Sequence, residues 1–172
     1  MKKRIVLTGG ASCGKSTTIN ALKQKGFPVL EEIAREVIER RGSFPTEKSE
    51  IKALQEEMFE MQIKGEDLLN GKLSFLDRGV GDYIAYSRHL LGYVHEMVAK
   101  FDFKERYKQV FALDRLPFID DGLRIESGDE EASKIHKDII NAYAVNGYNV
   151  VHVPVMSVDD RIEFILNNVD EN

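Results

Sequence analysis

Short runs of apolar residues recur along the chain, separated by segments with helical periodicity. The runs are rich in Val, Ile, Leu and Phe, which is typical of strands buried on both faces of a sheet. They cover residues 5–7, 27–30, 73–77, 110–113 and 150–153. Because strands alternate with helices throughout, we predict a three-layer α/β fold with a parallel five-stranded sheet between helices.

Helical patterns fill the intervals between these runs. They cover residues 14–25, 32–41, 47–70, 81–91, 94–103, 129–145 and a last segment that begins at 157. In the longest segment, Ile51, Leu54 and Met58 follow one another at intervals of three or four residues, which indicates one buried helix face. Ser157 precedes Asp160 by three positions, a spacing that resembles a capping box at the start of the last helix.

The composition indicates one globular domain. The 172 residues have about the length of a single domain, and a hydrophobic fraction of 42% is enough for a core, so we treat residues 1–172 as one domain. A net charge of −5 disfavours a large nucleic-acid surface, which usually carries a basic excess. The one cysteine, Cys13, excludes an internal disulfide and suits a reducing compartment. No signal peptide or membrane-spanning run is evident, so we expect a cytoplasmic monomer or homodimer.

Residues 9–16 match the pattern G-x-x-x-x-G-K-[ST], after a predicted strand and before a predicted helix. Glycines let the backbone approach an anion, and successive N–H groups then face phosphate at the positive end of the helix. This pattern is the phosphate loop (P-loop) of nucleotide-binding proteins. We expect Lys15 to reach the β- and γ-phosphates of ATP, with GTP also possible, and Ser16 to bind Mg²⁺. The predicted nucleotide-binding residues are Gly9, Gly10, Ala11, Ser12, Cys13, Gly14, Lys15, Ser16 and Thr17.

The third predicted strand ends in an acid, Asp77, which is followed by Arg78. Because an acid at this place commonly orders the Mg²⁺ water shell, we predict that Asp77 belongs to the metal site with Ser16. Motor-type ATPases place a glutamate next to this acid to activate water, whereas an arginine suits phosphoryl transfer. The N-K-x-D and D-x-x-G patterns of GTPase switches do not occur, since Val80 stands where the second pattern needs glycine.

Candidate acceptor-binding residues follow the second and third predicted strands. Glu32 and Arg35 lie three positions apart, on one face of a predicted helix. A carboxylate there can accept a proton from a substrate hydroxyl, so Glu32 and Asp77 are alternative bases, while an ordinary surface ion pair with Arg35 is the competing interpretation. The predicted acceptor-binding residues are Glu32, Arg35, Arg78 and Asp82, and Tyr83 and Tyr86 either line the same pocket or pack in the core.

A charged segment near residues 115–128 is typical of a mobile lid. It contains Arg115 and Arg124. Small P-loop kinases close such a lid over the triphosphate and deliver arginines from it, and we favour Arg124 for this role. A solvated loop without a catalytic role is the alternative.

Four blocks of residues, in order along the chain, resemble a known family. They are residues 7–16, 32–35, 76–86 and 121–124. On these blocks the chain resembles the small P-loop proteins grouped with the ribosylnicotinamide kinase domain of NadR, often described as AAA-domain ATPases. The resemblance implies an adenylate-kinase-like sheet of order 2-3-1-4-5 and ATP-dependent phosphoryl transfer. It does not carry over nicotinamide riboside as the substrate, because nicotinamide riboside kinases lack the Asp-Arg-Gly-x-x-Asp block of residues 77–82.

Two hypotheses for function follow. The first is a Mg²⁺- and ATP-dependent kinase that phosphorylates a small hydroxylated metabolite, such as a nucleoside. Its predicted catalytic residues are Lys15, Asp77, Arg78, Arg124 and Glu32. The second is a nucleotide-dependent regulatory module, a switch or slow NTPase without a small-molecule acceptor. Acceptor-dependent formation of ADP distinguishes the two.

Overall fold

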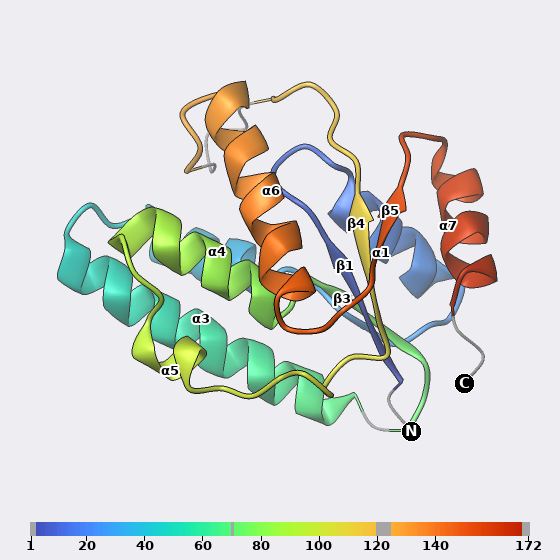
Figure 1. Ribbon diagram of the computed structural model, residues 1–172, viewed down its shortest axis with the longest axis horizontal. Helices are drawn as coiled ribbons and strands as arrows, with labels where there is room; N and C mark the ends of the chain where they lie inside the picture. The colour runs from blue at the N-terminus through green and yellow to red at the C-terminus, as the bar shows by residue number, and fades with distance from the viewer. Residues whose placement is uncertain (1–2, 70, 120–124, 170–172) are drawn as a thin grey trace.

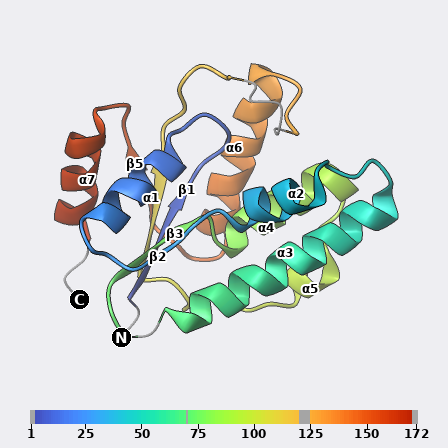
Figure 2. The same ribbon diagram turned by 180° about the vertical axis from the view of Figure 1, so that it is seen from behind.

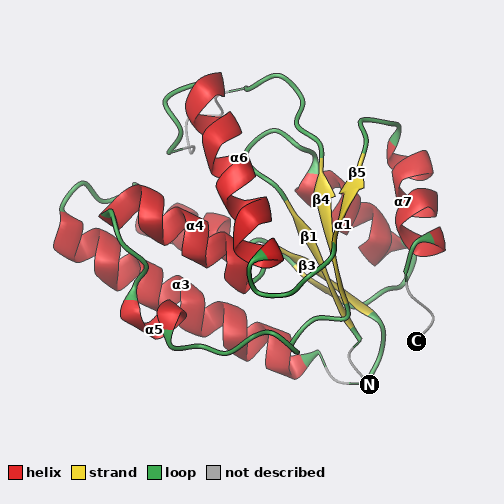
Figure 3. Cartoon of the chain, in the orientation of Figure 1, coloured by secondary structure: helices red, strands yellow, loops and turns green. Residues whose placement is uncertain are grey.

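A computed structural model describes residues 3–69, 71–119 and 125–169, and it has a central sheet with helices on both faces (Figure 1). The same three layers are evident when the chain is coloured by secondary structure (Figure 3). Within these ranges no helix is both long enough and apolar enough to cross a membrane.

The strands form one parallel sheet in the order β2-β3-β1-β4-β5. Their bounds are β1 (Arg4–Thr8), β2 (Val29–Leu30), β3 (Ser74–Asp77), β4 (Gln109–Leu113) and β5 (Val150–Val153). This order confirms the predicted adenylate-kinase-like arrangement, so the chain has a P-loop NTPase fold.

The register of the central strands determines where the site lies. Leu7 of β1 pairs with Asp77 of β3 on one side and with Phe111 of β4 on the other. Because the strands are parallel, the loop that follows Thr8 and the turn that follows Asp77 leave the sheet at the same edge. In open α/β sheets, ligands bind outside this carboxyl edge.

Alternate residues of β1 face the two helical layers. Ile5 and Leu7 pack against α1 (Lys15–Gln24) and α7 (Val158–Asn167), two helices that lie side by side in Figures 1 and 2. Val6 instead packs on the opposite face. The helices of that face are α2 (Ile33–Arg41), α3 (Lys48–Leu68), α4 (Val80–Leu91), α5 (Glu96–Ala99) and α6 (Asp129–Ala144).

One predicted helix is wrong in extent. A helix was predicted over residues 94–103, but α5 ends at Ala99. Asp102 accepts a hydrogen bond from the backbone N–H of Lys104, which forms a turn instead. This turn brings Phe103 into an aromatic cluster with Tyr107, Tyr143 and Tyr148, where it is 3% exposed. Burial of this aromatic ring therefore overrides the local helical pattern.

The N-terminus of α7 confirms the predicted cap. Ser157 precedes the helix in an extended conformation, and its hydroxyl accepts a hydrogen bond from the backbone N–H of Asp160 at 3.2 Å. A serine at this position satisfies one of the N–H groups that have no partner within the helix.

Candidate active site

The phosphate loop connects β1 to α1 and ends at the positive pole of that helix. Gly14 caps α1 with φ 76°, a left-handed conformation that favours glycine. Ser12 is also left-handed, with φ 58°, and its backbone oxygen and hydroxyl accept hydrogen bonds from the N–H groups of Leu116 and Ile119. The segment after β4 therefore holds the outer side of the loop.

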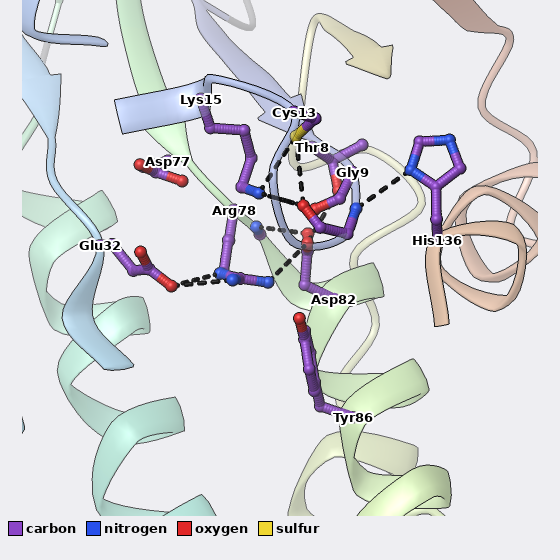
Figure 4. Close-up of polar contacts among 12 residues, drawn as sticks. Thr8, Gly9, Cys13, Lys15, Glu32, Asp77, Arg78, Asp82, Tyr86 and His136 are labelled. Carbon is purple, nitrogen blue, oxygen red and sulfur yellow. Dashed lines mark hydrogen bonds and ion pairs between the residues drawn. The ribbon is translucent and has the colours of Figure 1, made fainter. Parts of the chain in front are cut away.

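The ammonium group of Lys15 lies over the loop. Its Nζ donates to the carbonyl oxygens of Gly9 at 2.7 Å and Gly10 at 2.9 Å, and the residue is 6% exposed (Figure 4). These backbone oxygens hold the side chain beside the N-terminus of α1, and helix N-termini are favourable places for anions such as phosphate.

The first two glycines of the loop are required because α6 and β4 approach them closely. A Cβ atom on Gly9 would lie 2.9 Å from the carbonyl oxygen of Leu113, and one on Gly10 would lie 3.0 Å from that of Ala132. The N–H of Gly10 donates to Nδ1 of His136 at 3.1 Å (Figure 4). Burial and the charge of Lys15 lower the pKa of His136 to about 4, so its ring is neutral and can accept this hydrogen bond at neutral pH.

Sequence reasoning missed two of the side chains that position the loop. His136 is 126 positions from Gly10, and nothing in the local pattern of α6 marks it as a partner of the loop. Arg161, at 5% exposure, donates from Nη1 to the Thr18 hydroxyl at 3.1 Å and to the Gly14 carbonyl oxygen at 3.3 Å. Both contacts depend on how α6 and α7 pack, so the sequence alone could not have revealed them.

Arg115 also holds the loop from outside. Its Nε donates to the carbonyl oxygen of Ala11 at 3.2 Å, and its Nη2 pairs with Asp129 at 2.7 Å. Arg115 therefore ties the loop to the start of α6. The favoured lid arginine, Arg124, lies outside the described residues.

Asp77 and Ser16, the predicted metal-site residues, meet at the edge of the sheet. The Ser16 hydroxyl donates to Oδ2 of Asp77 at 3.0 Å, while Oδ1 is buried without a hydrogen-bond partner among the described residues. Burial and the charge of Glu32 raise the pKa of Asp77 to about 6. A hydroxyl and one carboxylate fit Mg²⁺, which commonly keeps several waters and binds through one or two carboxylates plus phosphates.

Arg78 occupies a strained position directly after β3. Its backbone φ of 77° is left-handed, and its N–H donates to the carbonyl oxygen of Leu7 at 3.1 Å. The side chain donates from Nε to Oε1 of Glu32 at 2.9 Å and lies over the ring of Tyr86, 4.8 Å from its centroid (Figure 4). Nη1 has no hydrogen-bond partner among the described residues and lies 3.7 Å from Asp82.

The charges of Glu32 and Arg78 stabilise each other. Burial works against the ionised carboxyl of Glu32, but the charges of Arg78 and Lys15 outweigh it and lower the pKa of Glu32. Burial likewise opposes the charge of Arg78, but the Glu32 carboxylate outweighs it and raises the pKa of Arg78. The pair is therefore ionised at neutral pH, with a side-chain exposure of only 14% for Arg78 and 18% for Glu32.

Asp82 acts as a structural hub rather than an open ligand group. Its Oδ1 accepts from the Thr8 hydroxyl at 2.8 Å, and its Oδ2 accepts from the Tyr143 hydroxyl at 2.7 Å and from the Gly79 N–H at 3.0 Å. Asp82 is 1% exposed. These bonds connect β1, the turn after β3 and α6 beneath Arg78.

A cavity of about 310 Å³ runs from the phosphate loop to the helices α2, α3 and α4. Its walls bring together many of the predicted residues: Ser12, Cys13, Gly14, Lys15, Ser16, Thr17, Glu32, Arg35, Arg78, Asp82, Tyr83 and Tyr86. The residues that line the cavity do not include Gly9, Gly10, Ala11 or Asp77. The Tyr86 hydroxyl donates to Glu126 at 3.0 Å, which adds the segment before α6 to the same wall.

Glu32 and Arg35 both line this cavity, although each forms an ion pair with another residue. Glu32 is the N-cap of α2 and pairs with Arg78, while Arg35 Nε pairs with Glu39 at 3.2 Å. The carboxylate of Glu32 thus faces the turn after β3 rather than solvent.

The chain belongs to the AAA-domain family, whose model matches residues 4–161. This confirms the family predicted from the four sequence blocks. A sequence search of curated proteins finds no significant match.

Several solved structures of kinases and of NadR share the fold. NadR in complex with NR has a TM-score of 0.76 and 19% identity over 98% of this chain, which spans 52% of the NadR chain, about half its length. Deoxyadenosine kinase from M. mycoides, with the products dCMP and dCDP bound, has a TM-score of 0.59 and 18% identity, covering 95% of this chain and 97% of that one. Thymidylate kinase from Candida albicans has a TM-score of 0.53 and 16% identity, covering 96% and 90%. At these identities the likeness shows the fold alone.

Proposed function

We propose that this protein is a Mg²⁺- and ATP-dependent kinase that transfers the γ-phosphoryl group of ATP to a hydroxyl of a small metabolite. The observation that carries the proposal is the cavity that joins the phosphate loop to the largely buried Glu32–Arg78 pair. A simple nucleotide switch needs only the phosphate loop and its metal site, whereas a kinase also needs a second compartment beside the γ-phosphate. The kinases among the similar structures support this choice.

The donor side holds the triphosphate. The N–H groups at the start of α1 bind phosphate oxygens, and Lys15 neutralises the charge that develops on the moving phosphoryl group. Ser16 and Asp77 would hold Mg²⁺, which would screen the phosphate charges. Catalysis here depends on position and electrostatics more than on covalent chemistry.

The acceptor side orients the hydroxyl. Glu32 is the better candidate for the base, because it lines the cavity, while Asp77 is 1% exposed and bonded to Ser16. The carboxylate of Glu32 accepts the hydrogen bond of the substrate hydroxyl. It takes the proton as the new O–P bond forms and the bond between the γ-phosphorus and the bridging oxygen breaks, which releases ADP. Arg78 keeps Glu32 ionised and adds a cation to the cavity wall. Arg35 adds a second cation to the wall, and Asp82 positions Arg78 from below.

The test is turnover with ATP, Mg²⁺ and a panel of hydroxylated acceptors. The proposal expects at least one acceptor to raise ADP formation well above the intrinsic rate. Lys15→Ala should lower that rate by about 10²–10³-fold, since one donor to the transition state is lost. Lys25→Ala, at the exposed end of the same helix, is the matched control and should leave the rate unchanged.

The regulatory module is the competing outcome of this experiment. Tight nucleotide binding without acceptor-dependent turnover for any compound would contradict the kinase and favour a switch or slow NTPase. An unchanged rate in Lys15→Ala would remove Lys15 from the mechanism.

A further inference from the structure

The turn that follows β3 is held at each of its backbone polar groups. The N–H of Arg78 donates to the carbonyl oxygen of Leu7, and the carbonyl oxygen of Arg78 accepts from Nε2 of Gln62 in α3 at 3.1 Å. The N–H of Gly79 donates to Oδ2 of Asp82, and the carbonyl oxygen of Gly79 accepts from the Asp82 N–H. A left-handed residue other than glycine persists only where its surroundings hold it, so these contacts matter for Arg78.

A buried carboxyl group in α3 organises two contacts to this turn. Oε1 of Glu66 accepts from Nε2 of Gln62 at 3.0 Å and from the Tyr107 hydroxyl at 2.9 Å. The Tyr107 oxygen in turn accepts from the N–H of Val80 at 2.9 Å. Glu66 is therefore connected to the carbonyl oxygen of Arg78 through Gln62 and to the N–H of Val80 through Tyr107. All three side chains are buried, and we call Gln62, Glu66 and Tyr107 the turn network.

The direction of the hydrogen bonds in the turn network follows from Glu66. Its Oε2 accepts from the guanidinium of Arg106, so both oxygens of this carboxyl group act as acceptors. The hydroxyl proton of Tyr107 therefore points towards Glu66, which leaves the Tyr107 oxygen to accept from the backbone. The amide nitrogen of Gln62 faces two acceptors, which fixes its orientation although Oε1 of Gln62 has no hydrogen-bond partner among the described residues.

The turn network lies behind the candidate site and not in it. None of its three residues lines the cavity, but the turn that they hold carries the side chain that pairs with Glu32 (Figure 4). A buried ion pair such as Glu66–Arg106 commonly adds little net stability over well-packed apolar side chains, whereas a connected polar network favours one geometry. The contacts thus point to control of the geometry of the turn.

We propose that Gln62, Glu66 and Tyr107 are positioning residues, which fix the backbone of residues 78–80 and thereby hold Arg78 in place against Glu32. They act through the turn and touch neither the nucleotide nor the acceptor. The inference rests on the proposed function for its effect on turnover. Its effect on the Arg78–Glu32 pair is measured in the free protein and does not depend on that function.

The first measurement is the NMR signal of the Arg78 Nε–H group, recorded without ATP, Mg²⁺ or acceptor. Its loss in Arg78→Lys identifies the signal. Gln62→Met keeps a similar length but has no amide donor, and Tyr107→Phe keeps the ring in the aromatic cluster but lacks the hydroxyl. Both variants should shift this signal and speed its exchange with solvent by about tenfold or more, because the turn opens more often.

Ile51→Val is the matched control for a general loss of stability. Ile51 is an apolar, buried residue of the same helix and does not line the cavity. The smaller side chain should lower the thermal midpoint, as the network variants do, but it should leave the Arg78 signal unchanged.

The second measurement is turnover with an acceptor that the wild-type protein phosphorylates. Gln62→Met and Tyr107→Phe should lower kcat by about 10–100-fold, because small displacements of catalytic groups are costly in rate. The affinity for AMP-PNP should stay unchanged, since the phosphate loop is not part of the turn network.

The proposal is overturned if the Arg78 signal is the same in wild type and in the network variants, or if Ile51→Val changes it as much. An altered signal with a wild-type kcat also contradicts it. If Gln62→Met does not fold, Tyr107→Phe decides the outcome. A protein without acceptor-dependent turnover refutes the kinase alone, because the comparison of NMR signals stands without it.

Discussion

Nε of Arg78 donates to Oε1 of Glu32 at 2.9 Å, which joins the turn after β3 to the first residue before α2. The two residues are separated by 46 positions, and both line the same cavity. The backbone of Arg78 adopts a left-handed conformation, with φ 77°. Strain of this kind, in a buried and charged pair, is typical of sites where geometry has to be fixed before the ligand binds.

The first prediction concerns the negative charge of Glu32. Glu32→Gln should lower kcat by about 10²–10⁴-fold, because the base that receives the hydroxyl proton is lost. It should also lower the pKa of Asp77 below its value of about 6, since the Glu32 charge helps to raise that pKa. Turnover measures the first effect, and NMR titration of the Asp77 carboxyl in the metal-free protein measures the second.

The neighbouring variant Glu31→Gln is the matched control for this substitution. Glu31 is exposed and pairs with Lys23 on the surface, so its loss should change neither kcat nor the titration of Asp77. If Glu32→Gln turned over acceptor at the wild-type rate, Asp77 would become the better candidate for the base.

The second prediction concerns the stability of the metal-free protein as a function of pH. The folded-state pKa of Asp77 is raised from 3.8 to about 6, so this group favours the folded state at low pH, and its contribution is lost as the pH rises through about 6. Asp77→Asn has no charge to bury. Relative to wild type, the variant should therefore be more stable at pH 8 than at pH 4. The free energy of unfolding from urea denaturation measures this difference.

The same variant should lose Mg²⁺-dependent turnover, because an amide is a weaker ligand for the metal than a carboxylate. Asp77→Asn would then combine unimpaired folding with lost activity. A variant that is equally destabilised at pH 4 and pH 8 and still active with Mg²⁺ would show that Asp77 is only a turn residue.

The third prediction concerns the close approach of α4 and α6. A Cβ atom on Gly81 would lie 2.6 Å from the ring of Tyr143, which is fully buried and bonded to Asp82. Gly81→Ala should destabilise the protein by about 1–3 kcal/mol despite the better helix propensity of alanine, because the crowded ring has to shift. Gly128→Ala is the control, since its backbone is extended and nothing lies within 4 Å.

Chemical denaturation measures the effect of both glycine substitutions. The control should stay within about 0.5 kcal/mol of wild type. Equal stability of Gly81→Ala and Gly128→Ala would mean that Tyr143 and its bond to Asp82 are not held rigidly under Arg78.

The fourth prediction concerns the ring that supports the phosphate loop. The folded-state pKa of His136 is lowered from 6.5 to about 4, so its contribution to stability is present above pH 6.5 and is lost as the pH falls towards 4. His136→Gln does not titrate. Its free energy of unfolding should fall less steeply than that of wild type between these pH values, and parallel curves would contradict the buried, neutral state of His136.

Local features of the chain were predictable because neighbouring residues determine them. The phosphate loop depends on glycines and on the sign of φ within residues 9–16, and the strands depend on continuous apolar runs. The cap at Ser157 depends on a spacing of three residues and is confirmed. The failure at residues 94–103 has the opposite cause, since burial of Phe103 among distant aromatic rings decides where α5 ends.

The tertiary structure alone decided which of the chemically suitable residues act together. The sequence marked Glu32, Arg78 and Asp82 as candidate acceptor ligands, but only packing paired the first two and placed the third beneath them. It also brought His136 to the phosphate loop and Gln55 of α3 into the cavity wall. These contacts form between residues far apart in the sequence, and their geometry depends on how helices pack against the sheet, which no local pattern encodes.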